Sequence, residues 1–162
     1  MQHDAMVTSL KSLKLFGMAQ AVAELAQQGA PAYQNAQNML GDLLKAEMAE
    51  REVRSVAYQM KIARFPTYRD LAGFDFTQSP VNEALVRQLH RCEFLEQAYN
   101  IVLVGGPGTG KTHLATALGV CAAKKRHRVV MRRAADLVRE LVEAREERVL
   151  GRLHRQYRKV DL

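Results

Sequence analysis

The sequence predicts an incomplete α/β core that is preceded by an all-α segment, and three observations lead to this fold class. Residues 101–104 read Ile-Val-Leu-Val, a short β-branched run that is typical of a buried strand. A glycine-rich loop and a helix-forming segment follow this run directly, and a second apolar run is centred on residues 129–131. Residues 1–64 instead carry apolar side chains at helical spacing.

The first part of the chain is predicted to be helical throughout. The apolar positions of residues 4–28 fit two amphipathic helices with a break near Phe16 and Gly17. Residues 32–65 contain no proline and predict one long helix, bent near Gly41, that ends before Pro66. These helices define an all-α N-terminal domain at 1–64, about the size of a compact bundle.

A connector at 65–79 leads into the second predicted domain at 80–162. Ser79 is expected to cap a helix that begins at Pro80 and runs to about residue 96.

Two more helices are predicted after the glycine-rich loop. One begins at Lys111 and ends near residue 124, and the other begins near Ala134 and is broken at Gly151. The last four residues, Lys-Val-Asp-Leu, are typical of the start of a third strand.

Composition excludes several classes of protein. The chain of 162 residues is 48% hydrophobic and 25% charged, a balance typical of globular domains. No apolar run approaches the ~18 residues that span a bilayer, and the N-terminus lacks the pattern of a secretory signal. Cys92 and Cys121 form no Cys-x-x-Cys pair and have no histidines at ligand spacing, so we expect free thiols and no metal site. A cytoplasmic protein without a membrane segment is expected.

The net charge of +7 lies entirely in one part of the chain. Residues 1–120 carry 11 basic and 11 acidic side chains, whereas residues 121–162 carry 13 basic and 6 acidic ones. Such a basic half next to a neutral half suggests an anionic partner such as nucleic acid. The alternative is a solvated, arginine-rich helix face.

Residues 105–112 match the phosphate-binding motif G-x-x-x-x-G-K-[ST] in full. Glycines allow the backbone to wrap a phosphate with its N–H groups pointing inward, and the following helix presents its positive end to the same anion. Lys111 would reach the β- and γ-phosphates, and the Thr112 hydroxyl would ligate Mg²⁺. No N-K-x-D signature is present, which favours ATP over GTP. The predicted nucleotide-binding residues are Gly105, Gly106, Pro107, Gly108, Thr109, Gly110, Lys111 and Thr112.

The match extends beyond the loop. Residues 105–119 (GGPGTGKTHLATALG), together with 126–153, resemble the IstB-like ATP-binding proteins, helper ATPases of insertion-sequence transposition that are related to the helicase loader DnaC. Residues 10–25, 49–66 and 73–76 (GFDF) are similar to the helical N-terminal region and connector of this family.

The resemblance implies an AAA+ ATPase that assembles on DNA as a homo-oligomer and partners a transposase. It implies that residues 74–76 lie near the adenine, although anchoring of the connector by Phe74 and Phe76 is the favoured alternative. The N-terminal helices would contact DNA or transposase, or would simply expose solvated basic residues. The basic residues concerned are Lys14, Lys45, Arg51, Arg54, Lys61 and Arg64.

The sequence lacks the acidic motif that ATP hydrolysis requires, an apolar strand that ends in Asp-Glu. Asp75 lies in the connector, Asp136 opens a helix, and Asp161 falls where family members begin that strand. The sensor residues and arginine finger of the family are missing too. We therefore expect a chain truncated before its catalytic strand, which binds ATP but does not hydrolyse it alone and has no catalytic residue.

Three functions remain open from the sequence. The first is an ATP-binding helper of DNA transposition, present as a fragment or disrupted copy. The second is a DnaC-like helicase-loading protein. The third is a non-catalytic module that binds DNA or a partner protein and carries a vestigial phosphate-binding loop.

Overall fold

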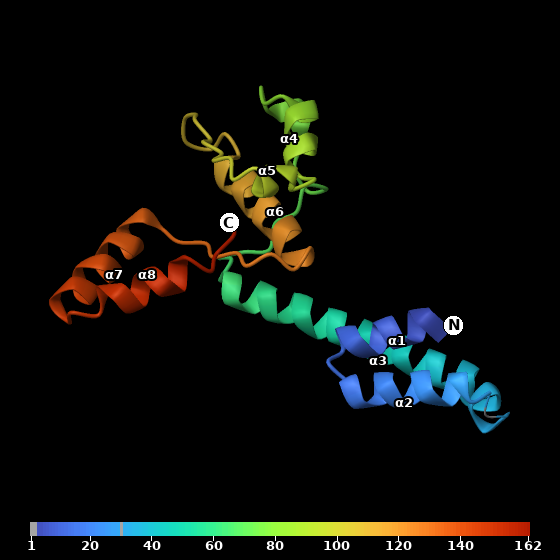
Figure 1. Cartoon of the computed structure of the whole chain (residues 1–162). Helices are drawn as coiled ribbons and strands as arrows, with labels where there is room; N and C mark the ends of the chain where they lie inside the picture. Colours follow the sequence, from blue (N-terminus) through green and yellow to red (C-terminus); the bar gives the residue numbers. More distant parts are fainter. Residues whose placement is uncertain (1–2, 30) are drawn as a thin grey trace. The chain divides into compact units, whose positions relative to one another are not determined.

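The computed structural model describes residues 3–29 and 31–162, which fold into two compact units, Met1–Arg54 (unit 1) and Ser55–Leu162 (unit 2) (Figure 1). No helix among these described residues is both long enough and apolar enough to cross a membrane. The helices are α1 (His3–Ser12), α2 (Phe16–Gln27), α3 (Pro31–Ala63), the 3-10 helix η1 (Phe76–Gln78), α4 (Glu83–Leu89), α5 (Glu93–Glu96), α6 (Lys111–Lys124), α7 (Ala134–Glu146) and α8 (Leu150–Tyr157).

Unit 1 consists of α1, α2 and the first part of α3, which share one apolar core (Figure 1). The turn between α1 and α2 is a Schellman turn, in which Leu15 N–H donates to Leu10 C=O at 2.9 Å and Lys14 lies in the left-handed region at φ 61°. The break therefore precedes Phe16 and Gly17, which both lie inside α2. The buried core residues are Met6, Leu10, Leu13, Ala19, Val22, Tyr33 and Leu44.

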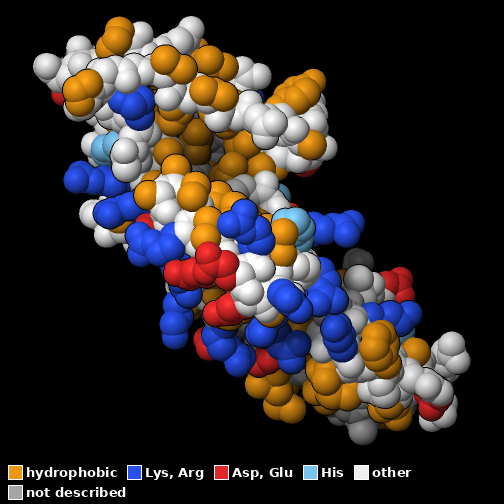
Figure 2. Space-filling view, turned by 90° about the vertical axis from the view of Figure 1, so that its left-hand side faces the viewer, with side chains coloured by type: hydrophobic (Ala, Val, Ile, Leu, Met, Phe, Trp, Pro, Cys, Tyr) orange, Lys and Arg blue, Asp and Glu red, His pale blue; other side chains and the backbone are white. Residues whose placement is uncertain are grey.

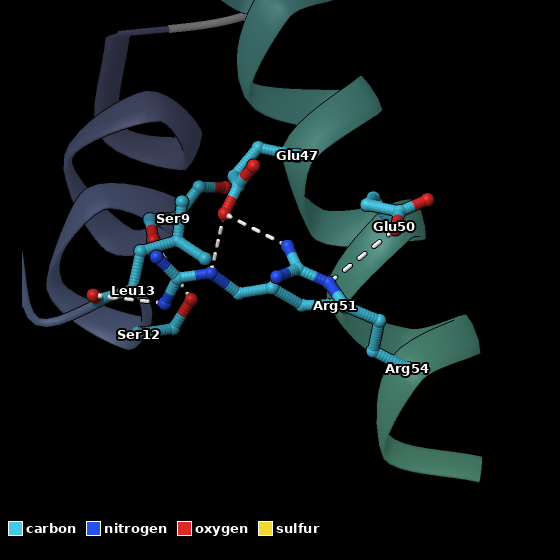
Figure 3. Close-up of polar contacts among 7 residues, drawn as sticks. All are labelled: Ser9, Ser12, Leu13, Glu47, Glu50, Arg51 and Arg54. Carbon is cyan, nitrogen blue, oxygen red and sulfur yellow. Dashed lines mark hydrogen bonds and ion pairs between the residues drawn. The ribbon is translucent and has the colours of Figure 1, made fainter. Parts of the chain in front are cut away.

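Arg51 joins α3 to the end of α1 (Figure 3). Its Nη1 donates to the Leu13 carbonyl at 3.2 Å, and its Nε donates to Glu47 Oε1 at 2.6 Å. Carbonyl groups at a helix C-terminus lack intrahelical partners, so the guanidinium satisfies one of them. Arg54 lies one turn further along and pairs with Glu50 at 3.3 Å. Arg51 therefore has a packing role that Arg54 does not share.

Unit 2 is built around α6, which is buried along nearly its whole length. Gly119 lies on this helix where it meets Phe65, because a Cβ added at Gly119 would lie 2.8 Å from Phe65 Cε1. The fully buried Thr116 satisfies its hydroxyl within the helix by donating to the Thr112 carbonyl at 2.7 Å. The core residues around α6 are Ala63, Cys92, Cys121, Ala122, Ala123 and Val129.

The predicted sheet does not form: within residues 3–29 and 31–162 no strand is present. Residues 101–104 form no regular secondary structure, and none of their backbone groups bonds to another described segment. Val102 and Val104 are 80% and 90% exposed. A strand requires a neighbouring strand for its N–H and C=O groups, and none lies beside this one.

The second and third predicted strands do lie side by side. Val130 N–H donates to the Leu162 carbonyl at 2.9 Å, and Asp161 N–H donates to the Arg128 carbonyl at 2.8 Å. These bonds are too few for a regular ladder. A largely apolar cavity of about 190 Å³ lies next to this pair and is lined by side chains of both extended regions and of α6, among them Ile101, Leu103, Leu118, Val129 and Leu162.

Two helix boundaries differ from the predictions. The helix expected at Pro80 begins at Glu83, because the side chain of Asn82, and not that of Ser79, caps it by accepting a bond from Leu85 N–H at 3.0 Å. It ends at Leu89, and the left-handed Cys92 separates it from α5.

The break expected at Gly151 comes earlier, between α7 and α8. Arg148 adopts φ 58°, and Val149 N–H donates to the Ala144 carbonyl at 2.9 Å, which forms a second Schellman turn. Gly151 itself lies within α8.

Candidate functional site

The eight predicted nucleotide-binding residues form a loop and the first turn of α6 in unit 2. Gly108 and Gly110 adopt φ 75° and 86°, which only glycine reaches without strain. Gly110 is the N-cap of α6 and has no side chain, so the first N–H groups of the helix have no capping partner. Gly106 and Pro107 are exposed, as are the neighbouring residues of the loop. The backbone thus presents open donors where a phosphate would bind.

Lys111 folds back over this loop. Its Nζ donates to the Gly106 carbonyl and lies 3.3 Å from Thr109 Oγ1. The Thr109 hydroxyl donates to the same carbonyl at 2.9 Å. Gly105 completes the arrangement, since an added Cβ there would lie only 3.0 Å from Thr109 Oγ1. The ammonium group therefore sits at the centre of the loop, where it would meet a polyphosphate.

Thr112 is exposed and lines a cavity of about 760 Å³. The cavity is rich in charged groups from the end of α3, the segment before α7, and α7 itself. The other lining residues are Arg64, Pro66, Met131, Arg132, Arg133, Asp136 and Glu140. The Thr112 hydroxyl is therefore reachable by a ligand on the side away from the buried face of α6.

The connector contacts the loop through Phe74. A Cβ added at Gly110 would lie 2.5 Å from Phe74 Cε2, so the ring covers this glycine. Phe74 also makes edge contacts with Phe76 and His113, at centroid distances of 4.9 Å and 5.2 Å. Phe76 lies under the guanidinium of Arg87 at 5.4 Å. Both rings therefore pack against neighbouring side chains and anchor the connector in unit 2.

The sequence interpretation missed two residues of this cluster, His113 and Asp70. His113 Nε2 lies 2.8 Å from the Asp70 carbonyl, and Asp70 Oδ1 accepts a bond from Gly73 N–H at 3.0 Å. Two signals were available in the sequence. His113 lies three positions after Gly110, on the same side of a helix, and Asp70 followed by Gly73 is typical of a turn that the side chain stabilises.

Asp75, Asp136 and Asp161 each have a polar partner, although Asp136 also lines the cavity that Thr112 reaches. Asp75 accepts bonds from the Thr77 hydroxyl at 2.6 Å and from Thr77 N–H at 2.9 Å, which lower the pKa of its carboxyl. Asp136 pairs with Arg139 at 3.4 Å. Asp161 accepts a bond from Arg128 N–H at 2.8 Å. In the part of the chain that the structure describes, no three His, Cys, Asp or Glu side chains gather as a metal site.

The two cysteines are free and buried in unit 2, as expected. Their sulfur atoms lie 3.9 Å apart, and Cys121 Sγ also donates to the His90 carbonyl at 3.0 Å. Burial, followed by the neighbouring Cys121, raises the pKa of the Cys92 thiol to about 11. The Cys92 thiol therefore remains protonated at neutral pH.

Basic side chains gather on the hairpin of α7 and α8. Figure 2 shows Lys and Arg side chains on the face that these helices turn toward the viewer. An open cavity of about 530 Å³ on this hairpin is lined by Arg152, Arg155, Gln156, Arg158 and Lys159. The acidic Glu140 is instead occupied within the hairpin, since it accepts a bond from the Tyr157 hydroxyl at 2.8 Å and lies 3.6 Å from Arg132.

Comparison with known proteins finds a family and several relatives that are named for ATP binding. The family described as IstB-like ATP binding protein matches residues 8–162. A Pseudomonas aeruginosa protein named for ATP binding in insertion sequence IS21 is 37% identical over 91% of this chain and 55% of its own length. A counterpart from insertion sequence IS5376 of Geobacillus stearothermophilus is 36% identical over 72% of this chain and 45% of its own length. A third, from IS232 of Bacillus thuringiensis, is 32% identical over 99% and 64% respectively.

The chain thus spans about half the length of the first two of these curated relatives. The family match nevertheless begins at residue 8 and includes the loop, α6 and the α7–α8 hairpin. By this match, the chain belongs to the IstB-like ATP-binding protein family.

Proposed function

We propose that this chain binds ATP with Mg²⁺ through residues 105–112 and acts as an ATP-binding helper in DNA transposition. The observation that carries the proposal is the position of Lys111, whose ammonium group lies in a glycine loop with open backbone donors. The family implies a P-loop NTPase fold and ATP binding. The relatives are named for insertion sequences, which favours transposition over helicase loading.

The residues of the loop fit a nucleotide polyphosphate. Lys111 would exchange the Gly106 carbonyl for phosphate oxygens, which form stronger, charge-assisted bonds. Side chains larger than hydrogen would disturb the loop at Gly105 and Gly110, where an added Cβ meets Thr109 or Phe74. Thr112, exposed on the first turn of α6, would hold Mg²⁺ through its hydroxyl.

We expect no ATP hydrolysis by these residues alone. Hydrolysis requires a carboxylate that orients water near the γ-phosphate, and Asp75, Asp136 and Asp161 are bonded to other groups. We propose that binding without turnover is the property of the described residues.

Nucleotide binding can be tested with a fluorescent ATP analogue in the presence and absence of Mg²⁺. Lys111→Ala should weaken binding at least tenfold, because it removes the charge that faces the β- and γ-phosphates. Thr112→Val should weaken only the Mg²⁺-dependent part of binding. Lys125→Ala, one residue past the far end of α6, is the matched lysine control and should bind as the wild type does. Equal affinity of Lys111→Ala and the wild type would refute the proposal.

The α7–α8 hairpin is the proposed DNA surface. Its exposed arginines can neutralise phosphates, so affinity for duplex DNA should fall steeply with salt through counterion release and depend little on sequence. The triple substitution of Arg152, Arg155 and Arg158 by Gln should reduce both the affinity and its salt dependence. Arg87→Gln is the control, because Arg87 lies on α4, outside the hairpin, and is paired with Glu83. An unchanged salt dependence in the triple variant would refute this surface.

A transposase is the proposed protein partner, and self-association the proposed assembly, on the strength of the family alone. Co-purification of the chain with the transposase encoded by the same insertion sequence tests the first. Sedimentation with ATP and DNA tests the second.

A further inference from the structure

The turn formed by residues 70–76 is attached to the phosphate-binding loop at two points. At the first point the Phe74 ring lies against Gly110, so closely that a methyl group on this glycine would lie 2.5 Å from Cε2 and 3.1 Å from Cζ. At the second point His113 Nε2 lies 2.8 Å from the Asp70 carbonyl. Both attachments reach the N-cap and first turn of α6, where the predicted phosphate donors are located.

The turn is itself closed by local hydrogen bonds. Phe74 N–H donates to the Leu71 carbonyl at 3.2 Å, and Gly73 N–H donates to Asp70 Oδ1 at 3.0 Å. Phe76 and His113 both contact the Phe74 ring in edge geometry, with interplanar angles of 69° and 88°. Such edge contacts fix the orientation of an aromatic ring.

Gly110 is the residue through which this packing acts on the loop. Its φ of 86° lies in the left-handed region and sets the direction in which α6 begins. Lys111 and Thr112 are the next two residues, so the backbone conformation of Gly110 determines the direction of their N–H groups. A loop held in its bound conformation loses less entropy when a ligand binds, so the ring should strengthen phosphate binding without touching the phosphate.

We propose that Phe74 is a positioning residue for the phosphate-binding loop, and that the order of residues 70–76 is coupled to nucleotide occupancy. This inference rests on the proposed ATP binding. Coupling between two sites is reciprocal. A nucleotide on the loop therefore also stabilises the turn, and loosening the turn weakens nucleotide binding.

The test compares two phenylalanines that both cover a glycine of α6. Phe74 covers Gly110 at the start of the helix, and Phe65 covers Gly119 near its end, where an added Cβ would lie 2.8 Å from the ring. Both rings are half-buried, and Phe65 packs against the core around α6. Phe74→Ala should weaken binding of the fluorescent ATP analogue about tenfold, whereas Phe65→Ala should change it less than twofold. Phe74→Leu, which keeps an apolar side chain, should show an intermediate loss of affinity. It replaces Phe74→Ala in the comparison if the alanine variant does not fold.

A second measurement follows the turn directly. Amide hydrogen exchange within residues 70–76 should slow when ATP and Mg²⁺ are added to the wild-type chain, and should not change in Lys111→Ala. Equal loss of affinity in Phe74→Ala and Phe65→Ala, or wild-type affinity in Phe74→Ala and Phe74→Leu, would overturn the positioning role and leave ATP binding intact. Absence of ATP binding by the wild-type chain would overturn the proposed function, and the coupling with it.

Discussion

In unit 1 the three helical segments bond their own backbones and bury one shared core, whereas in unit 2 residues 101–104 form no regular structure and have no backbone partner among the described residues. The apolar side chains show the same contrast. Met6 and Leu10 are at most 1% exposed, but Val102 and Val104 are 80% and 90% exposed. A helix satisfies its hydrogen bonds within one segment, while a strand depends on segments that are distant in the sequence.

The largest expected effect comes from comparing one apolar residue of each region. Leu10→Ala should lower the free energy of unfolding by about 2–5 kcal/mol, because it leaves a cavity in the core of unit 1. Val102→Ala should change it by less than about 0.5 kcal/mol, because this side chain is already in solvent. Urea unfolding followed by far-UV circular dichroism measures both. A Val102→Ala loss comparable to that of Leu10→Ala would show that residues 101–104 are packed in solution.

A glycine-to-alanine change should have opposite signs in the two units. Gly119→Ala should destabilise unit 2 by about 1–3 kcal/mol, because the new methyl group meets Phe65. Gly17→Ala should stabilise unit 1 by up to about 1 kcal/mol, because nothing lies within 4 Å and alanine favours the helix. Thermal unfolding of both variants checks the signs. Combining Gly119→Ala with Phe65→Leu should recover part of the loss.

A smaller effect is expected from the arginines of α3. Arg51→Met should cost about 1 kcal/mol, because the Leu13 carbonyl loses its donor at the end of α1 (Figure 3). Arg54→Met should cost less than about 0.5 kcal/mol, because its ion pairs are exposed. Chemical unfolding of the two variants at low and moderate salt separates these contributions. Equal losses would contradict a capping role for Arg51.

The smallest expected effect is a dependence of unit 2 stability on pH. Burial, followed by the charges of Lys125 and Lys124, lowers the pKa of His90 below its ordinary value of 6.5. The unfolded chain therefore takes up this proton first as the pH falls through 6.5, and stability decreases until the pH is below the folded-state pKa. His90→Gln should remove this part of the pH dependence. Unfolding titrations between pH 8 and pH 5, within the range that histidine senses, provide the measurement.

The sequence predicted well those features that depend on neighbouring residues. The helix at Lys111 has the expected start and end, since its apolar positions and the glycine before it are local signals. The helix break predicted at Gly151 lies instead at Arg148, which adopts the left-handed conformation. Arginine is not a residue type that predicts this conformation. Strands were predicted at residues 101–104 and 129–131, but neither is a strand in the described residues, because strand formation depends on partners that local patterns do not supply.

The candidate site divides in the same way. The loop from Gly105 to Thr112 was identified from its residue types and their spacing. The contact of Phe74 with Gly110 joins residues 36 positions apart, and only the fold brings them together. The sequence left two interpretations of the connector phenylalanines, a position near the adenine and the favoured anchoring of the connector, and neither predicted the contact with Gly110.

The unpaired segment at residues 101–104 has a consequence for the life of the protein in a cell. Exposed valines beside unpaired N–H and C=O groups can pair with the backbone of another chain. Chaperones and proteases also recognise such exposed apolar segments. We expect the abundance of this protein to be set by how quickly that surface is covered, more than by its synthesis. Pulse–chase measurement of its half-life, compared with that of a variant carrying Val102→Lys and Val104→Lys, would show whether this surface governs its turnover.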